Sequence, residues 1–363
     1  MKIAHIFWGL GFGGIETMLV NIANAQVDYG ADVHLVLINE LYEKTLLDRL
    51  SSNVHIHLLN RKLGSKGLGF IWKLNKELRI INPDKIHLHG PEFYAMIFGR
   101  RLSHVVSLTL HALPVQPVRH RSCWRALVAR LTFGFKYGED LVTQIPQLFA
   151  ISSSVKEAFY AKYNVDSMIV YNGILTSNFS RKVSYNITPP IFRVIQISRL
   201  DHQKKGQDLL IKAASILKGK LDVTFIGDGD SMAYLKELSQ KLEVNDYVHF
   251  LGKKTQGYIA EHLKDYSLFI QPSRREGFGL TVAEAMAAKV PVLVSSGQGP
   301  AEVTENIKYG WVFLNGDEND LASQIIYLIS HYEDAERKAN LAYDYVCSHY
   351  DVSITARSYL ELY

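Results

Sequence analysis

The chain has 363 residues, of which 47% are hydrophobic and 21% are charged, and its mean hydropathy is close to zero. This length and composition are typical of a globular protein with two or three domains. Its two cysteines, Cys123 and Cys347, cannot form a disulfide framework and do not have the spacing of a metal site. No apolar run approaches the roughly 20 residues of a membrane-spanning helix, and glycine interrupts the first apolar segment too early for a secretory signal. We therefore expect a cytoplasmic protein.

The net charge of +4 is unevenly distributed along the chain. Up to residue 190 there are 21 basic and 13 acidic residues, a balance of +8, whereas the remainder has 19 basic and 23 acidic residues, a balance of −4. This asymmetry suggests that the N-terminal half meets an anionic partner, such as a membrane surface, a lipid phosphate or a nucleic acid.

The chain begins with a strand pattern over residues 2–8, a glycine-rich turn, and a helical pattern over residues 16–29. Such a turn allows a phosphate to approach backbone N–H groups at the start of a helix. Gly9, Gly11 and Gly14 also match the dinucleotide pattern G-x-G-x-x-G, and Glu40 ends the next predicted strand. An NAD-dependent oxidoreductase is therefore one interpretation of this segment.

Strand and helix patterns then alternate, which predicts an α/β fold with a parallel, doubly wound sheet. The predicted strands are residues 33–38, 54–58, 84–88, 105–110 and 147–151, and the predicted helices are residues 67–81, 91–102 and 153–163.

Histidines lie at the ends of two of these strands. His87 and His89 alternate on one strand, and His111 follows the next strand. The first two would share a face of the sheet and could hold a metal ion, but no third ligand has suitable spacing. We therefore predict no metal site.

The segment Arg119–Lys136 combines apolar residues at helical spacing with arginines offset from them. A basic amphipathic helix of this kind either covers the sheet with a solvated basic face or lies on an anionic membrane.

A second α/β unit follows a linker predicted at residues 184–190, so we expect domains at 1–185 and 192–347. Its first strand, residues 192–197, is followed by Arg199 and by the pair Lys204 and Lys205, just before a predicted helix. Cations at such a position suit a diphosphate leaving group.

The most informative stretch is residues 273–287, which follows the apolar strand at 268–270. Ser273 is a candidate helix cap, and the glycines from Gly277 would open backbone N–H groups to an anion. Glu276 and Glu284 flank this turn at a separation of just over two helical turns, so both could contact one ligand.

These motifs resemble glycosyltransferase family 4, whose members are retaining enzymes of the GT-B architecture. Glu276 to Glu284 matches the family's E-x7-E motif, and Gly13-Gly14-Ile15-Glu16 matches its G-G-x-E turn. The segment Ser198–Gly206 is similar to its S-R-L…K-G element, and Val170–Ile174 is similar to its V-x-N-G-[IV] segment. The resemblance implies two facing Rossmann-like domains with a cleft between them, and a C-terminal helix at about 350–363 that packs back on the first domain.

The resemblance also implies roles for individual residues. His111 and Glu276 would face the donor sugar, while Arg199 and Lys205 would grip the diphosphate, with Lys204 as the alternative lysine. The implied donor-binding residues are Gly13, Gly14, Asn172, Gly227, Gly252, Gly277, Phe278, Gly279, Leu280 and Glu284. Asp228 and Asp230 could suggest a D-x-D metal site, but they lie in a strand-to-helix turn where the family approaches the donor without a metal.

The implied function is retaining, metal-independent transfer of a sugar from a nucleotide-diphosphate sugar to an acceptor hydroxyl, without a cofactor. The acceptor would be a glycan or a lipid-linked molecule in polysaccharide, lipopolysaccharide or glycolipid synthesis. A peripheral contact with the inner face of the membrane through Arg119–Lys136 is compatible with this function, and we expect no nucleic acid partner. The alternatives are an NAD-dependent oxidoreductase, a GT-B-fold epimerase or phosphorylase, and a non-catalytic sugar-nucleotide binder.

Overall fold

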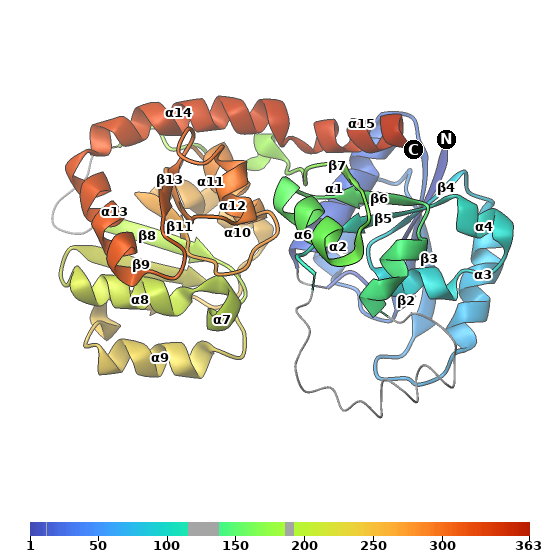
Figure 1. Cartoon of the computed structure of the whole chain (residues 1–363), viewed down its shortest axis with the longest axis horizontal. Coiled ribbons are helices and arrows are strands. Elements are labelled where there is room, and N and C mark those ends of the chain that lie inside the picture. Colours follow the sequence, from blue (N-terminus) through green and yellow to red (C-terminus); the bar gives the residue numbers. More distant parts are fainter. Residues whose placement is uncertain (12, 115–137, 186–191) are drawn as a thin grey trace. The chain divides into compact units, whose positions relative to one another are not determined.

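The computed structural model of the chain divides into two compact units (Figure 1). It describes all residues except 12, 115–137 and 186–191, so the predicted basic helix at Arg119–Lys136 lies outside the described residues. The first unit comprises Met1–Tyr171 and Thr355–Tyr363, and the second comprises Asn172–Ile354. Within the described part of the chain, no helix has the length and hydropathy needed to cross a membrane.

The first unit contains a seven-stranded parallel sheet, as the alternation of strand and helix patterns predicts. The strands, in their order across the sheet, are β3 (His55–Arg61), β2 (Asp32–Asn39), β1 (Lys2–Phe7), β4 (Lys85–Leu88), β5 (Val106–Leu110), β6 (Gln147–Ala150) and β7 (Met168–Ile169). Its helices are α1 (Gly14–Asp28), α2 (Lys44–Leu47), α3 (Gly69–Ile81), η1 (Pro91–Met96), α4 (Arg100–His104), η2 (Gly138–Gln144) and α6 (Ser153–Tyr163).

The second unit contains a six-stranded parallel sheet with the same pattern of connections. Its strands, in order across the sheet, are β10 (Val248–Phe250), β9 (Leu221–Ile226), β8 (Phe192–Ile197), β11 (Leu268–Gln271), β12 (Val292–Ser295) and β13 (Trp311–Phe313). Its helices are η3 (Thr176–Asn178), α7 (His202–Lys205), α8 (Gln207–Ile216), α9 (Met232–Lys241), η4 (Asn245–Tyr247), α10 (Gln256–His262), η5 (Leu263–Asp265), α11 (Leu280–Ala287), α12 (Gly299–Val303), α13 (Glu318–Ser330) and α14 (Tyr332–His349). The last helix, α15 (Val352–Leu362), carries the chain into the segment that belongs to the first unit.

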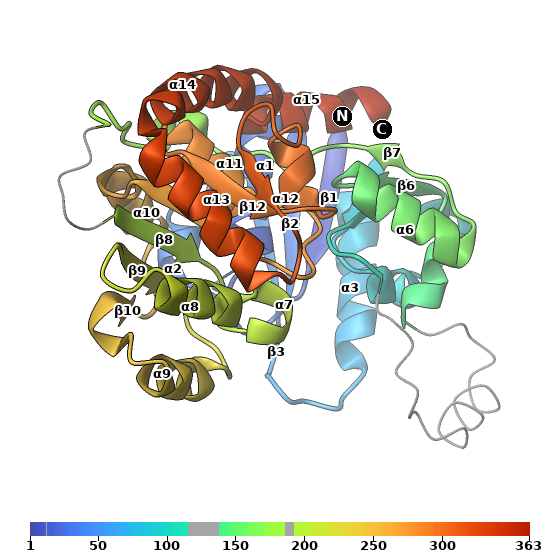
Figure 2. The ribbon, with the colours of Figure 1, turned by 60° about the vertical axis from the view of Figure 1, so that its left-hand side comes forward.

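Each sheet buries its own apolar core. In the first unit Leu19 of α1 packs with Val33 and Leu35 of β2, and in the second unit Val194 of β8 shares a cluster with Ile325 of α13. Helices α8 and α13 lie side by side in the second unit (Figure 2). Strands buried on both faces are expected in a parallel sheet, because its crossover helices cover both faces.

Both sheets reverse their strand order next to their first strand. The reversal lies between β1 and β4 in the first unit and between β8 and β11 in the second. Open parallel sheets bind ligands beyond the carboxyl ends of the strands at this point, because the two outgoing loops diverge there. This places the loops after β8 and β11 at the expected site of the second unit.

The first unit ends before the predicted linker. Residues 172–185 belong to the second unit, since the Ser180 N–H donates to the Ala260 carbonyl and the Lys182 N–H donates to the Ala288 carbonyl, both at 2.9 Å. These backbone hydrogen bonds are long-range, so composition alone did not indicate them.

Two local predictions also differ from the structure. The helix predicted at 91–102 is split into η1 and α4 by Gly99, which has a φ of +101°. Ser273 is not a helix cap; it is buried, its hydroxyl accepts from the Gln271 amide at 2.8 Å, and α11 begins at Leu280. By contrast, the predicted start of α6 is confirmed, because the Ser152 hydroxyl accepts from the Val155 N–H at 3.1 Å.

One glycine brings the loops after β8 and β11 into backbone contact. Gly206 has a φ of +68°, and a β-carbon added there would lie 2.9 Å from the Pro272 carbonyl carbon and closer still to its oxygen. Gly219, in the same unit, has a φ of +81° with no heavy atom within 4 Å of such a β-carbon. The two glycines therefore share a backbone conformation but differ in the space around them.

We expect Gly206→Ala to lower the free energy of unfolding by about 3 kcal/mol or more, because it adds a backbone clash to the left-handed strain. Gly219→Ala, the matched control, should cost only the strain, about 1–2 kcal/mol. Urea denaturation followed by circular dichroism measures both losses. Equal losses would show that the Gly206–Pro272 approach does not constrain the two loops.

Candidate active site

The loops that follow β8 and β11 are held against each other by their backbones. Besides the contact between Gly206 and Pro272, the Arg275 N–H donates to the Lys204 carbonyl at 3.2 Å. Because parallel strands end at one edge of a sheet, these two loops bring together the cations after β8 and the carboxylate after β11.

An ion pair between Lys205 and Glu276 lies where the two loops meet. Their side chains are 23% and 20% exposed, so both remain accessible to a ligand. Lys204, in contrast, is 64% exposed and pairs with Asp201 at 3.2 Å. Of the two candidate lysines, the structure places Lys205 beside the E-x7-E motif.

Hydrogen bonds fix the backbone on both sides of this ion pair. The Glu276 N–H donates to Gln298 Oε1, and its carbonyl accepts from the Gly299 N–H, both at 3.1 Å. Arg274 binds the buried Asp208 carboxylate with two nitrogens, at 2.7 and 2.8 Å. A bidentate pair of this kind fixes orientation as well as distance, so the loop presents Glu276 in a defined position.

Arg199 differs from Lys205 in having no ionic partner. It is exposed, and its guanidinium forms no hydrogen bond or ion pair with any residue that the structure describes. Its backbone is nevertheless anchored, since the Gln207 amide donates to the Arg199 carbonyl and to the Ser198 hydroxyl, each at 2.9 Å. The side chain is therefore a cation on a fixed backbone.

The glycine turn leads into α11 without a side-chain cap. Gly279 is the N-cap with a φ of +104°, and its carbonyl accepts from the Val282 and Ala283 N–H groups. The N–H groups of Leu280 and Thr281 lie in the first turn, where an α-helix offers no internal acceptor. They point along the positive end of the helix dipole, which favours an anion.

Phe278 anchors this turn through its side chain. The ring is buried and packs edge-on against Tyr350 at 5.3 Å between centroids. Of the predicted donor-binding residues, Phe278 can therefore meet a ligand only through its backbone.

Glu284, the second carboxylate of the motif, lies in the middle of α11. It is only 8% exposed, and its carboxylate accepts from the Gln256 amide at 2.8 Å. Burial raises the pKa of Glu284 from its ordinary value to about 7, and the Gln256 hydrogen bond partly opposes this shift. Burying an ionised carboxylate in this way lowers the stability of the fold. Shifted pKa values of this kind are common at functional sites.

The other predicted residues of the second unit lie near these loops in different ways. The Gly227 N–H donates to the Gly252 carbonyl at 2.9 Å, and a β-carbon at Gly227 would collide with the Ser198 carbonyl. Both glycines are thus linked to the end of β8. Asn172 is buried, and its Oδ1 has no hydrogen-bond partner among the residues that the structure describes.

In the first unit, the glycine turn lies at the carboxyl end of β1. Gly13 is the N-cap of α1, and Gly14 is the first residue of that helix. A β-carbon at Gly13 would collide with the Glu16 carboxylate, so this glycine lets the acidic side chain fold back over the start of the helix.

Buried histidines form a hydrogen-bonded line that ends at His111. His5 Nε2 lies 2.7 Å from Gln26 Oε1, His5 Nδ1 lies 3.1 Å from His89 Nε2, and His89 Nδ1 lies 3.0 Å from His111 Nε2. Burial lowers the pKa of His5 and of His111 to about 4, so both rings are neutral at neutral pH. His111 Nδ1 is buried and has no hydrogen-bond partner among the described residues.

The line determines which nitrogen of His111 carries its proton. A neutral imidazole has one N–H group and one lone pair. With the Gln26 amide oriented as in the structure, each ring donates from Nε2 and accepts on Nδ1, which leaves a lone pair on Nδ1 of His111. The sequence indicated His89 and His111 but not His5 and Gln26. The signal that could have found His5 was its place inside the first predicted strand, residues 2–8.

Comparison with known proteins identifies the family. Residues 12–178 match the family model Glycosyltransferase Family 4, and residues 182–344 match the model Glycosyl transferases group 1. The N-acetyl-alpha-D-glucosaminyl L-malate synthase of Bacillus anthracis is 30% identical over 343 residues, which are 88% of this chain and 86% of that protein. This chain belongs to glycosyltransferase family 4. It is therefore a glycosyltransferase, and the oxidoreductase interpretation of its first glycine turn is wrong.

The chain is also similar to a further relative and to a solved structure. An N,N'-diacetylbacillosaminyl-diphospho-undecaprenol alpha-1,3-N-acetylgalactosaminyltransferase of Campylobacter jejuni is 32% identical over 164 residues, 44% of this chain and 41% of that protein. The crystal structure of Anabaena Alr3699/HepE in complex with UDP and glucose aligns with a TM-score of 0.78 at 21% identity, over 100% of this chain and 99% of that one. The predicted fold class, an α/β GT-B glycosyltransferase with two Rossmann-like domains, is confirmed.

The raised pKa of Glu284 predicts a stability effect with a definite sign. Since the folded-state pKa of about 7 exceeds the ordinary value of 4.5, the penalty is absent below pH 4.5 and complete above pH 7. We expect Glu284→Gln to raise the free energy of unfolding at pH 8 by about 2–3 kcal/mol and to leave it unchanged near pH 4.5. Urea denaturation at both pH values measures this effect. Exposed Glu237 supplies the control, and a pH-independent gain in Glu284→Gln would contradict the burial argument.

The buried histidines predict loss of stability in mild acid. The unfolded chain takes up a proton on each histidine near pH 6.5, whereas folded His5 does so only near pH 4. His5 thus contributes a fall of about 1.4 kcal/mol per pH unit between these values. We expect His5→Asn to reduce this slope in urea denaturation, and the exposed control His104→Asn to retain it. Equal slopes in wild type and His5→Asn would contradict the low pKa of His5.

Proposed function

We propose that this glycosyltransferase transfers a sugar from a nucleotide-diphosphate sugar to an acceptor hydroxyl with retention of anomeric configuration. The observation that carries the proposal is the Lys205–Glu276 ion pair at the strand-order reversal of the second unit, beside the uncapped start of α11. A cation, a carboxylate and helix N–H groups at one edge of a sheet match a sugar joined to a diphosphate.

The leaving diphosphate would be stabilised by fixed positive charge. The guanidinium of Arg199 has no ion-pair partner among the described residues, and Lys205 is held beside Glu276 by two anchored loops. The N–H groups of Leu280 and Thr281 would add hydrogen bonds as charge develops on the diphosphate. Preorganised donors of this kind supply transition-state stabilisation without solvent reorganisation, so we propose that no metal is needed at the diphosphate.

The two glutamates would have different roles. Glu276 is partly exposed and would orient sugar hydroxyls, with Lys205 exchanging its partner from Glu276 to the diphosphate when donor binds. Glu284 is buried and would accept hydrogen bonds from the ribose hydroxyls. These hydrogen bonds would take the place of the water that its buried carboxylate lacks. Phe278, Gly277, Gly227 and Gly252 would contribute backbone contacts only, and Asn172 a side-chain amide.

His111 of the first unit would accept a hydrogen bond from a donor sugar hydroxyl through Nδ1. Its support is the histidine line, which leaves a lone pair on that atom. Gly13 and Gly14 remain proposed contacts to the diphosphate, as the family motif implies.

We favour displacement on one face of the sugar over a double displacement. The bond from the anomeric carbon to the diphosphate oxygen breaks while a bond to the acceptor oxygen forms on the same face. The acceptor proton passes to the departing diphosphate oxygen, so no separate base and no cofactor is required. Retention would follow from the shared face.

Relatives suggest the classes of donor and acceptor to test first. The Anabaena structure contains UDP and glucose, and the Campylobacter relative is named for a diphospho-undecaprenol acceptor. We propose a UDP-sugar as donor and a lipid-linked or soluble glycan acceptor of polysaccharide or glycolipid synthesis. Peripheral membrane contact through Arg119–Lys136 is a further proposal that rests on the basic charge of that segment.

The decisive experiment compares two neighbouring lysines. Nucleotide-sugars are first ranked by thermal shift, and turnover of the best donor is then measured with wild type, Lys205→Ala and Lys204→Ala. We expect Lys205→Ala to lower turnover by about 10²–10³-fold, because it removes a fixed donor to the leaving group. Lys204→Ala should retain near-normal turnover, because its side chain faces Asp201.

Two outcomes would contradict the proposal. Wild-type turnover in Lys205→Ala would remove its assigned role, and no shift with any UDP-, GDP-, ADP- or CMP-sugar would remove the proposed donor class. Circular dichroism of each variant confirms that the fold is intact.

A further inference from the structure

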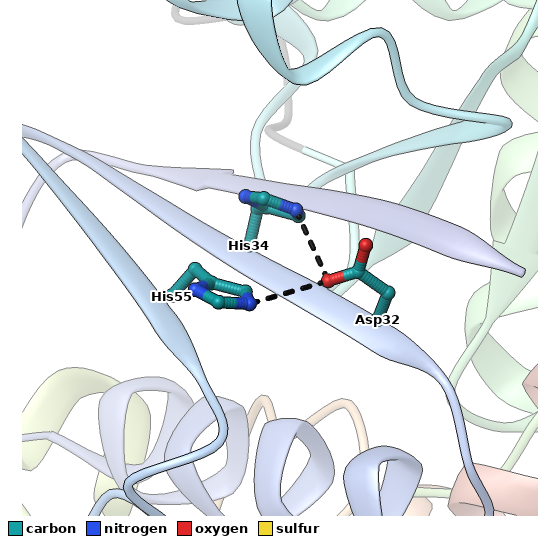
Figure 3. A group of neighbouring side chains, drawn as sticks. All are labelled: Asp32, His34 and His55. Carbon is teal, nitrogen blue, oxygen red and sulfur yellow. Dashed lines mark ion pairs between the residues drawn. The ribbon is translucent and has the colours of Figure 1, made fainter.

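A second group of histidines lies at the opposite edge of the first unit's sheet, where β2 and β3 begin. His34 of β2 and His55 of β3 are register partners on neighbouring parallel strands, and Asp32 precedes His34 by two residues. Side chains alternate along a strand, so all three share one face of the sheet. Figure 3 shows both rings directed at the same carboxylate oxygen, Asp32 Oδ1, which lies 3.2 Å from His34 Nε2 and 3.4 Å from His55 Nε2.

Two further residues, His57 and Glu77, continue the chain of contacts from the other ring nitrogen of His34. His34 Nδ1 lies 2.9 Å from His57 Nε2, and His57 Nδ1 lies 3.2 Å from Glu77 Oε2. The result is a line of Asp32, His34, His57 and Glu77 with a carboxylate at each end.

The side chains of this line have too few N–H hydrogens to make a hydrogen bond at each of its contacts. Its three contacts require three hydrogens, but two neutral imidazoles supply two and ionised carboxylates supply none. If Glu77 accepts from His57 and His57 accepts from His34, the lone pair of His34 Nε2 faces the Asp32 oxygen. That Nε2 atom is buried, and apart from this contact with Asp32 it forms no hydrogen bond with any described residue. Two lone pairs at 3.2 Å repel each other unless a positive charge lies between them.

We propose that Asp32, His34 and His55 bind a first-row divalent metal ion, with zinc as the best fit. In tetrahedral zinc sites with bonds of about 2.0–2.2 Å, neighbouring ligand atoms lie about 3.3–3.6 Å apart. The separations of 3.2 and 3.4 Å are close to the lower end of this range, and all three ligand atoms lie within 4.8 Å of one another. Two imidazoles and a carboxylate are also a ligand set that zinc accepts.

The surroundings of the site fit a metal as well. A ligating histidine usually donates its other N–H to a carboxylate or another acceptor, which fixes its tautomer, and the His57–Glu77 pair does this for His34. The His55 side chain is 60% exposed, so an ion can enter and keep water as a fourth ligand.

The proposed metal would join β2 to the edge strand β3. Its ligands begin their strands, whereas the glycine turn and His111 follow the carboxyl ends of β1 and β5 of the same sheet. We therefore assign it a stabilising role, independent of the proposed glycosyl transfer.

Metal binding is tested on the full chain after treatment with a chelator. Co²⁺ is added alone and the visible absorption of tetrahedral Co²⁺ is recorded, then Zn²⁺ is added as a competitor and the melting temperature is measured. We expect a saturable Co²⁺ spectrum that Zn²⁺ abolishes, and a melting temperature that rises with Zn²⁺ concentration.

Variants separate this site from the other histidines. His55→Ala, at an exposed position that tolerates truncation, should lose the Co²⁺ spectrum and the Zn²⁺-dependent rise in melting temperature. His249→Ala is the matched control, because His249 also lies 3.2 Å from an aspartate, Asp222, outside any three-ligand group of the described residues. Glu77→Gln should weaken Co²⁺ binding by about 10–100-fold.

Either of two results would overturn the proposal. One is a wild-type protein with no tetrahedral Co²⁺ spectrum and no response to Zn²⁺, which would mean that a shared proton supplies the positive charge. The other is an unchanged Co²⁺ titration in His55→Ala.

Discussion

The candidate active site depends on the backbone contact between two loops that leave neighbouring parallel strands. Gly206 lies so close to the Pro272 carbonyl that an added β-carbon would collide with it, and the Arg275 N–H donates to the Lys204 carbonyl. These contacts bring the cation after β8 and the carboxylate after β11 into an ion pair. The chemistry proposed for the second unit therefore follows from a constraint on backbone approach.

The two histidine groups of the first unit show how hydrogen counting separates two kinds of site. In the line from Gln26 to His111, three neutral rings supply hydrogens for three contacts, and a lone pair remains at the far end. In the line from Asp32 to Glu77, two rings stand between two carboxylates and one hydrogen is missing. The first arrangement is complete without a cation and presents an acceptor, whereas the second requires a positive charge.

Burial of polar groups in this chain lowers its stability, and a bound ligand could offset that loss. Glu284 would be ionised in water at neutral pH and His111 would be protonated in mild acid, but burial opposes the charged form of each side chain. Apolar residues at these positions would stabilise the fold more. Stability is commonly sacrificed in this way where a ligand later supplies the missing polar contacts.

The amino-acid sequence by itself determined the α/β class, the alternation of strands and helices, and the motif that indicates the family. These features depend on local periodicity and on spacing within one segment. Helix and strand patterns gave most of the elements, although Gly99 split one predicted helix and Ser273 proved to be a buried core residue. Only the tertiary structure showed which lysine pairs with Glu276 and which nitrogen of His111 carries no hydrogen. It also showed that Asp32 lies beside two histidines from different strands. These facts depend on register between segments distant in sequence, and local patterns carry no information about register.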